Sequence, residues 1–303
     1  MSTIAWIGLG HMGVPMSSHL VAAGHTVRGF DIDPACLQAG SARGVTPVRS
    51  VAEALEGAEA CFTSLPMPRH VRGVYDGPDG IWAHADGRTL LMDTSTVDVA
   101  TSRWCHEESA TRGFGFVDAP VSGGTAGAEA HTLTFMLGGR PADVERAHAY
   151  VAPMAGSVIP CGSGGAGIAA KLVNNMMLFV SMMGVAEGSQ LAEHLGLDAS
   201  VFWNVANVSS GQSWPQRTWY PVPGVVATAA ANHNFDAGFS VDLARKDCSL
   251  AVQAGQETGV HLPAAALALS QLDQLVEEGL GGKDCTLVTK LASPDGTLRG
   301  WTP

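Results

Sequence analysis

The stretch TIAWIGLGHMG, residues 3–13, decides the fold. It joins an apolar run that suits a β-strand to glycines at positions 8, 10 and 13, and helical spacing follows from Val14 to Ala23. A second apolar run, Thr26 to Phe30, ends in Asp31. Strand, glycine turn, helix and strand, with an acidic residue about twenty positions further on, form the fingerprint of a dinucleotide-binding unit. The sequence therefore predicts a dinucleotide cofactor here in preference to a plain glycine turn.

The residues of this turn have separate expected roles. Gly8 makes the tight turn, Gly10 lets the backbone approach the pyrophosphate, and Gly13 lets the helix pack closely on the strand. The helix N-terminus faces the phosphates because its free N–H groups attract anions. His11 and Met12 lie between these glycines, so we expect them to contact the cofactor as well.

Asp31 predicts which dinucleotide is bound. A carboxylate at the end of the second strand accepts hydrogen bonds from the adenosine ribose and repels a 2′-phosphate. Asp33 adds charge of the same sign, and Arg28, the nearest upstream base, precedes the strand end. We therefore expect NAD as the cofactor in preference to NADP.

Strands and helices continue to alternate, which predicts an open α/β sheet. Ala60 to Leu65 is an apolar strand followed by Pro66, and Leu90 to Met92 is another, followed by a polar turn to Thr96 and a helix from Val99. Ligands of such sheets bind at the carboxyl ends of the strands. Leu65, Pro66 and Thr96 are therefore candidate cofactor contacts, although ordinary turn and N-cap chemistry would explain the same residue types.

A loop of small residues follows the next predicted strand, in the segment FVDAPVSGGTAGA, residues 116–128. Such residues leave successive backbone N–H groups exposed, and these can bind an anion. With a cofactor already placed, the natural anion is a substrate carboxylate. A flexible glycine linker is the alternative.

One long helix is predicted from Ile168 to about Leu195, apolar almost all the way round. Lys171 and Asn175 are four residues apart and so share one face of it. A buried lysine is costly unless it is paired or its pKa is lowered. The alternative is a lysine whose ammonium reaches solvent from the first turn.

A change of pattern divides the chain into two domains. The last strand signals are Leu133 to Leu137 and Ser157 to Pro160, and Ser163 to Gly167 predicts a hinge into the long helix. Helical periodicity then marks the segments 191–197, 199–205, 241–256 and 264–278. We therefore place an α/β dinucleotide-binding domain at residues 1–163 and an all-α domain at 164–303.

Bulk properties restrict the partners. The net charge of −11 and pI near 5.4 argue against nucleic acid or an anionic membrane as partner. Six cysteines without a CxxC pair favour reduced, packed thiols over a disulfide framework or a metal site. No signal or transit peptide is recognisable, and the uncharged run Met176 to Ala186 is too short to cross a bilayer. We expect a cytoplasmic protein without bound metal.

Five motifs occur in one order along nearly the full length: GLGHMGVPM at residues 8–16, DTST at 93–96, DAPVSGG at 118–124, GIAAKLVNN at 167–175 and KD at 246–247. With them the chain resembles the β-hydroxyacid dehydrogenase family, and within it the 3-hydroxyisobutyrate dehydrogenases. The resemblance implies a Rossmann-type doubly wound sheet followed by an all-α domain, joined through the long helix. It also implies homodimers or homotetramers that form mainly through the helical domains.

The same resemblance implies roles for individual residues. Lys171 is the catalytic acid and base, and Asn175 positions it and the substrate. The other implied contacts are Ser122, Gly123, Gly124 and Trp214 to the substrate, Leu65, Pro66 and Thr96 to the cofactor, and Lys246 to both. Three departures from the family are His131 in place of a glycine, Cys248 in place of a leucine, and a tail from about Gly281 that we cannot align.

The expected activity is NAD-dependent oxidation of a small 3-hydroxy acid, foremost 3-hydroxyisobutyrate to methylmalonate semialdehyde, a step of valine catabolism. Tartronate semialdehyde reduction and oxidation of serine or 3-hydroxypropionate are the alternatives within the family. A non-catalytic dinucleotide-binding scaffold is the alternative outside enzymes, and the intact Lys171 and Asn175 count against it.

Overall fold

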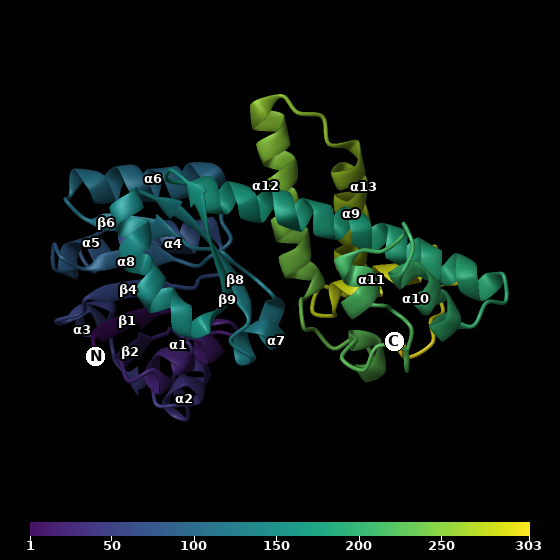
Figure 1. Ribbon diagram of the computed structural model, residues 1–303, viewed down its shortest axis with the longest axis horizontal. Helices are drawn as coiled ribbons and strands as arrows, with labels where there is room; N and C mark the ends of the chain where they lie inside the picture. Colours follow the sequence, from purple (N-terminus) through teal and green to yellow (C-terminus); the bar gives the residue numbers. More distant parts are fainter. The chain divides into compact units, whose positions relative to one another are not determined.

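The structure is a computed structural model that describes residues 1–303. It comprises two compact units, Met1–Lys171 and Leu172–Pro303. The division lies inside α9 (Ala166–His194), a continuous helix that begins in the first unit, whereas the sequence places the boundary at the hinge before this helix. Figure 1 labels helices and strands of both units where there is room, and the units are described in turn.

The first unit is built on a nine-stranded sheet of order β3-β2-β1-β4-β5-β6-β8-β7, with β9 paired to β8. The strands from β3 to β6 are parallel, β8 is antiparallel to β6 and β7, and β9 is parallel to β8. The order 3-2-1-4-5-6 is that of a Rossmann-type fold, as predicted. The strand bounds are Thr3–Ile7 (β1), Thr26–Phe30 (β2), Thr46–Pro47 (β3), Ala60–Thr63 (β4), Leu90–Asp93 (β5), Gly115–Asp118 (β6), Val121–Ser122 (β7), Leu133–Gly139 (β8) and Ala155–Gly162 (β9).

Helices cover both faces of this sheet because successive strand residues point to opposite sides. Ile4 and Trp6 belong to a core that includes Met16 and Leu20 of α1. On the other face the ring of Tyr75 contacts those of Trp82 and Phe116. The helix bounds are Gly13–Ala22 (α1), Pro34–Ser41 (α2), Val51–Leu55 (α3), Pro68–Tyr75 (α4), Ile81–His84 (α5), Val99–Thr111 (α6), Gly124–Glu129 (α7) and Pro141–Val151 (α8), and Ala152–Met154 forms a 3-10 turn.

Three helices that the sequence pattern does not reveal begin at a proline: α2 at Pro34, α4 at Pro68 and α8 at Pro141. Proline is tolerated at the first helical position, where its missing N–H has no partner to lose. The prolines at 66 and 68 predict only a loop, so the start of α4 there is a finding of the structure. Likewise residues 191–194 are the end of α9 and not a separate helix.

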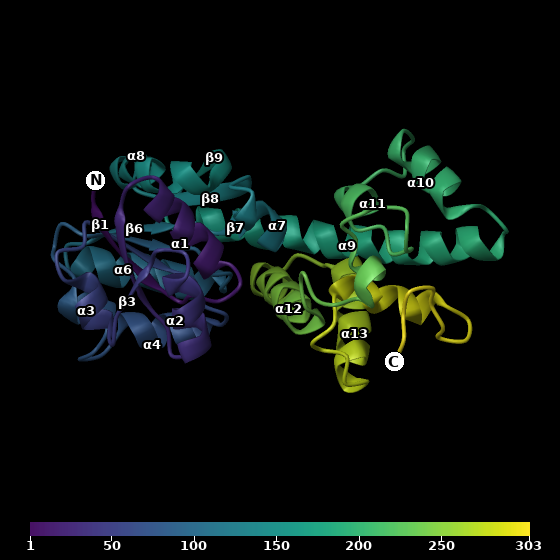
Figure 2. The same ribbon diagram turned by 90° about the horizontal axis from the view of Figure 1, so that it is seen from below.

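The second unit is all helical, as predicted. After α9 come α10 (Ala199–Asn207), α11 (Trp214–Thr218), α12 (Val241–Thr258) and α13 (Pro263–Glu277), with 3-10 turns η2 (Ala230–His233) and η3 (Cys285–Ala292). Figures 1 and 2 show α12 and α13 lying side by side. The core contains Phe179 and Met182 of α9 together with Ala244 of α12 and Leu272 of α13. The segment between α10 and α12 holds the short helix α11.

By length and composition alone, α9 passes the test for a membrane-crossing helix, with a mean hydropathy of 1.5 in its best window. This differs from the prediction because a window average tolerates Asn and an isolated charge. A core helix of a soluble protein passes the same test, so the property is weak support for a membrane span.

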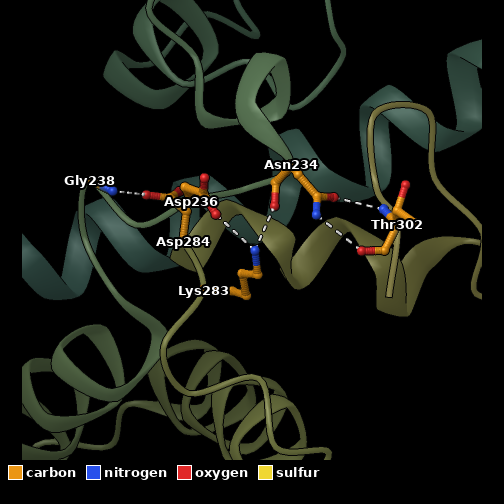
Figure 3. A network of polar contacts seen from close by, with 6 residues as sticks. All are labelled: Asn234, Asp236, Gly238, Lys283, Asp284 and Thr302. Carbon is orange, nitrogen blue, oxygen red and sulfur yellow. Dashed lines mark hydrogen bonds and ion pairs between the residues drawn. The ribbon is translucent and has the colours of Figure 1, made fainter.

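The C-terminal tail, which the sequence leaves unplaced, is tied to the second unit (Figure 3). Asn234 has a left-handed backbone, with φ of 51°, and its side chain bonds both the N–H and the C=O of Thr302, at 2.7 and 3.1 Å. Lys283 Nζ donates to Asn234 O and pairs with Asp236, while Asp284 accepts from Gly238 N at 3.0 Å. These bonds join three segments that are far apart in the sequence.

Candidate functional site

The glycine turn after β1 has the geometry that its sequence predicts. Gly8 has φ of 97°, and a Cβ on it would lie 2.3 Å from Ser64 O. A Cβ on Gly13 would lie 2.0 Å from Gly8 O, so only glycine lets α1 pack this closely. At Gly10 a Cβ would meet no atom within 4 Å. The glycine at position 10 is therefore not required by packing within the protein, which leaves open space for a ligand.

The N-terminus of α1 fits a bound pyrophosphate. Its N-cap residue is Met12, no side chain caps the first turn, and the first turn holds no acidic residue. Helix N-termini of this kind attract anions through their N–H groups and dipole. His11 is exposed at the turn. The contacts of Gly10, His11 and Met12 with the cofactor stay a prediction.

Asp31 lies against the same turn, directly after β2. Its Oδ2 accepts from Leu9 N at 2.6 Å, and its Oδ1 accepts from Asp33 N at 2.9 Å. Arg28 Nη1 instead donates to Glu56 O at 2.6 Å, in an exposed position. A carboxylate stands beside the glycine turn and the nearest arginine is engaged elsewhere, which suits a free ribose hydroxyl better than a 2′-phosphate.

The ends of β4 and β5 are joined by a buried polar network. Asp93 Oδ1 accepts from Thr63 Oγ1 at 2.7 Å and from Ser95 N at 3.2 Å, and Leu65 N donates to Ser95 Oγ at 2.8 Å. Burial raises the pKa of Asp93 to about 6, against the lowering effect of its bonds to Ser95 and Thr63. The network holds the backbone of Leu65.

Leu65 and Pro66 follow β4 and Thr96 follows β5; Leu65 and Thr96 are half-buried and Pro66 is exposed. They therefore lie at the carboxyl edge of the sheet, where ligands of this fold bind. The turn chemistry considered as an alternative is present too, because Ser95 bonds across to the neighbouring loop. Their contact with the cofactor stays a prediction.

The loop after β6 has a backbone that requires glycine. Ser122 ends β7, and Gly123 and Gly124 follow with φ of 133° and 65° at the start of α7. Met136 N bonds Pro120 O at 3.0 Å and holds the loop against β8. This segment is therefore an ordered turn within the sheet and not a flexible linker. Its binding of a substrate carboxylate stays a prediction.

His131, the first departure from the family, occupies a backbone position that suits the family's glycine. It has φ of 47°, a left-handed conformation that favours glycine, and its ring lies against His19 with centroids 5.3 Å apart. Cys248, the second departure, is a buried thiol whose Sγ lies 3.5 Å from Ala265 O. Burial raises the pKa of Cys248 to about 12. This cysteine therefore packs as a small apolar residue.

Lys171 and Asn175 lie one turn apart on α9, with 8% and 1% of their surfaces exposed. The alternative of a lysine extended into solvent is thus wrong for this structure. Asn175 Nδ2 donates to Asp247 Oδ2 at 2.8 Å, and Asn174 Nδ2 donates to Asn175 Oδ1 at 3.2 Å. The amide of Asn175 therefore has a defined orientation.

Asp247 is the site residue that the sequence reasoning missed. It is buried on α12, 72 positions from Asn175, and its Oδ1 lies 2.8 Å from Lys246 Nζ. Adjacent side chains on a helix do not usually face each other, so the spacing alone predicts no ion pair between Lys246 and Asp247. The structure shows the ion pair with its neighbour all the same, because the lysine side chain is long enough to reach back. The Lys-Asp motif itself was the available signal.

Trp214 begins α11 and keeps 42% of its surface exposed. Its ring meets Trp219 edge to face at 4.7 Å, and Trp219 in turn contacts Phe239 at 6.3 Å. The residue lies in an aromatic cluster of the second unit with one side open. Its role in substrate binding stays a prediction.

Two family models match consecutive parts of the chain. Residues 3–162 match the NAD binding domain of 6-phosphogluconate dehydrogenase. Residues 165–292 match a model described as NAD-binding of NADP-dependent 3-hydroxyisobutyrate dehydrogenase. The cofactor indicated by these domains is NAD, in agreement with the glycine turn.

Two curated relatives are similar over most of their length. A probable 3-hydroxyisobutyrate dehydrogenase of Mycobacterium tuberculosis is 45% identical over 263 residues, 87% of this chain and 88% of the relative. An NAD-dependent L-serine dehydrogenase of Pseudomonas aeruginosa is 39% identical over 294 residues, 97% of this chain and 99% of the relative.

Among solved structures, a Mycobacterium tuberculosis 3-hydroxyisobutyrate dehydrogenase with L-serine superposes with a TM-score of 0.89 at 42% identity, covering 96% of this chain and 99% of the other. The family models, the relatives and this fold agree with one another. The chain belongs to the NAD-dependent β-hydroxyacid dehydrogenase family, with 3-hydroxyisobutyrate dehydrogenases among its near relatives.

Proposed function

We propose that this protein oxidises 3-hydroxyisobutyrate to methylmalonate semialdehyde with NAD, and that Lys171 is the general acid and base. The observation that carries the proposal is the buried pair on α9, in which Lys171 lies one turn before an amide that Asp247 orients. Supporting it are several relatives named as 3-hydroxyisobutyrate dehydrogenases.

The chain's own residues supply proton transfer and orientation. When bound, NAD would supply the hydride acceptor for the hydroxyl-bearing carbon. Lys171 Nζ takes the hydroxyl proton as the C–H bond breaks, which leaves an aldehyde, and it returns a proton in the reverse direction. Asn175 cannot replace it, because an amide has no useful proton affinity near neutral pH. We assign Asn175 to orientation instead, since its own amide is held by Asp247.

The remaining predicted residues bind and orient. The backbone N–H groups of Ser122, Gly123 and Gly124 hold the substrate carboxylate, and Trp214 covers the substrate. Leu65, Pro66 and Thr96 contact the cofactor. Lys246 lies close to both ligands, and its pairing with Asp247 keeps it in place. The hydroxyl-bearing carbon would then be the one two bonds from the carboxylate carbon, which defines a 3-hydroxy acid.

L-Serine is the second candidate substrate, since one relative is named for it and one similar structure was solved with it. Serine also carries its hydroxyl on the third carbon, so the same oxidation would convert it to 2-aminomalonate semialdehyde. It differs from 3-hydroxyisobutyrate in bearing an ammonium where the other bears a methyl group.

A panel of hydroxy acids tests the assignment. NADH formation would be followed by absorbance with 3-hydroxyisobutyrate, serine, glycerate and 3-hydroxypropionate. Both enantiomers of each chiral acid would be tested. We expect the highest kcat/KM for 3-hydroxyisobutyrate. A higher value for serine transfers the assignment to serine, and no turnover of any 3-hydroxy acid would contradict the function.

A lysine substitution tests the mechanism. Lys171→Met keeps the aliphatic chain and removes the amine, so kcat should fall about 10²–10⁴-fold, the usual contribution of acid–base catalysis. Lys290→Met is the matched control, because Lys290 pairs with Glu278 on the surface of the second unit. Near-normal kcat in Lys171→Met would refute the role of this lysine.

We also propose a cytoplasmic homodimer or homotetramer assembled through the helical unit. Large apolar side chains are exposed on α9 and α10, among them Met177, Leu191, Val201 and Val205. Exposed apolar patches commonly mark protein interfaces. Light scattering on a size-exclusion column would contradict the proposal if the protein eluted as a monomer.

A further inference from the structure

One buried carboxylate connects the substrate loop to the lysine helix. Asp118 ends β6, is 1% exposed, and stands four residues before Ser122. Its Oδ1 lies 2.7 Å from His106 Nε2 and accepts from Gly165 N at 2.9 Å, while its Oδ2 accepts from Ile168 N at 2.8 Å. Two of its three partners are therefore backbone N–H groups at the start of α9.

The carboxylate suits this end of the helix. The first N–H groups of a helix have no partner within it and carry partial positive charge. The Asp118 carboxylate accepts hydrogen bonds from two such N–H groups, those of Gly165 and Ile168. His106 Nε2 lies within hydrogen-bond distance of its Oδ1. The ring of His106 is itself held by Phe116, with centroids 4.7 Å apart. The helix start is thus tied to the strand end by the buried Asp118 side chain, with the half-buried His106 beside it.

Two glycines let the backbones meet at the same point. A Cβ on Gly167 would lie 2.3 Å from Met136 O and 2.8 Å from Asp118 Oδ2. A Cβ on Gly138 would lie 2.5 Å from Asp118 Oδ1 and 2.7 Å from Gly167 N. Because neither glycine has a side chain, the first turn of α9 packs directly on β8, and the Asp118 carboxylate lies against both glycines.

We propose that Asp118 is a positioning residue for Lys171: by holding Gly165 and Ile168, it sets the place of the lysine relative to the loop at Ser122. Ile168 precedes Lys171 by three residues, about 4.5 Å along the helix axis. The main chain of Asp118 leads into the loop while its side chain holds the helix, so one residue relates both parts. This role rests on the proposed function of Lys171 and extends it to a residue that does not touch substrate.

Asp118→Asn is the direct test. The asparagine amide has one acceptor oxygen and one NH2 group that only donates. If its oxygen faces His106 and Gly165, its NH2 group faces the N–H of Ile168, and two donors then meet without an acceptor. The helix start then loses one bond and shifts. Since a misplacement of about 1 Å can cost 10²-fold in rate, we expect kcat to fall about 10–100-fold while the Kd for NAD stays within about threefold. Asp143→Asn is the control, because Asp143 is another buried aspartate of this unit and its carboxylate pairs with Arg140 and Arg146.

A second pair of variants tests the same seat without altering the carboxylate. Gly167→Ala places a methyl group against Met136 O and should lower kcat to a similar extent. Gly184→Ala adds the same methyl group to the same helix where no atom lies within 4 Å, and should leave kcat within twofold. Should Asp118→Asn fail to fold, this pair decides alone.

Amide hydrogen exchange supplies a readout that needs no substrate. In Asp118→Asn the peptide covering residues 165–172 should exchange faster, with the rest of the first unit as in the wild type. Turnover would be measured with whichever 3-hydroxy acid the wild type uses fastest. If the wild type turns over none, the proposed function fails while the exchange result stands. Unchanged exchange, a fall in kcat below fivefold in both test variants, or an equal fall in the controls would overturn the positioning role.

Discussion

Substituting alanine at two glycines of the same turn should separate folding from cofactor binding. Gly10 and Gly13 are three residues apart, yet a Cβ on Gly10 meets nothing within 4 Å, and one on Gly13 lies 2.0 Å from Gly8 O and 3.0 Å from Trp6 Nε1. Trp6 Nε1 also donates a hydrogen bond to Gly8 O at 2.9 Å. The two atoms that would have to move to make room for the Cβ therefore hold each other in place. We expect opposite phenotypes from one added methyl group.

The magnitudes follow from these distances. Forcing an extra methyl group into a packed site costs about 1–3 kcal/mol. In Gly13→Ala this cost falls on the folded state and should lower the Tm of the first unit by about 2–12 °C. In Gly10→Ala it falls on the complex, where the backbone approaches the pyrophosphate. At about 1.4 kcal/mol for each tenfold change, the Kd for NAD should rise about 5- to 150-fold.

Calorimetry measures both quantities on the full chain. Gly10→Ala should melt within about 2 °C of the wild type or slightly above it, because alanine has fewer unfolded conformations to lose. Titration calorimetry with NAD then reports the loss of affinity. Wild-type affinity in Gly10→Ala, or a wild-type Tm in Gly13→Ala, would refute this reading of the turn.

Three further outcomes are expected. Because the pKa of Asp93 rises from 3.8 to about 6 on burial, the folded state keeps a proton that the unfolded chain releases in this window, so raising the pH from about 4 to 6 should remove up to about 3 kcal/mol of stability. Chemical denaturation should show that Asp93→Asn loses this fall, and an unchanged pH slope would contradict it. With Asp31 beside the glycine turn, kcat/KM should be at least about tenfold higher for NAD than for NADP, and comparable values would remove this role. Asn234→Gly keeps the left-handed backbone but loses both side-chain bonds to Thr302, each worth about 0.5–1.5 kcal/mol, so the Tm should fall by a few degrees with NAD affinity unchanged; a wild-type Tm would show that the tail is not held there.

Local patterns predicted the framework of this protein. The first two strands, Thr3–Ile7 and Thr26–Phe30, have the bounds that their apolar runs predict, and the long helix, α12 and α13 agree within two residues at each end. Periodicity, glycine turns and the acid at position 31 all act over a few residues or one βαβ unit, so they can be read without knowing the rest of the fold. The same reading identified Lys171 and Asn175 as neighbours, since i and i+4 share a helix face.

Only the tertiary structure showed how the candidate site is held. Asn175 meets Asp247 across 72 positions, and Asp118 meets Gly165 and Ile168 across 47 and 50. The raised pKa of Asp93 likewise depends on burial by strands distant in the sequence. A hydrogen bond requires its atoms to be placed within a few tenths of an ångström, and that placement results from packing the whole sheet and helices together. Residue types and short spacings carry no such information, which is why the sequence points to the candidate lysine but not to Asp118 and Asp247, whose carboxylates bond the start of its helix and its amide neighbour.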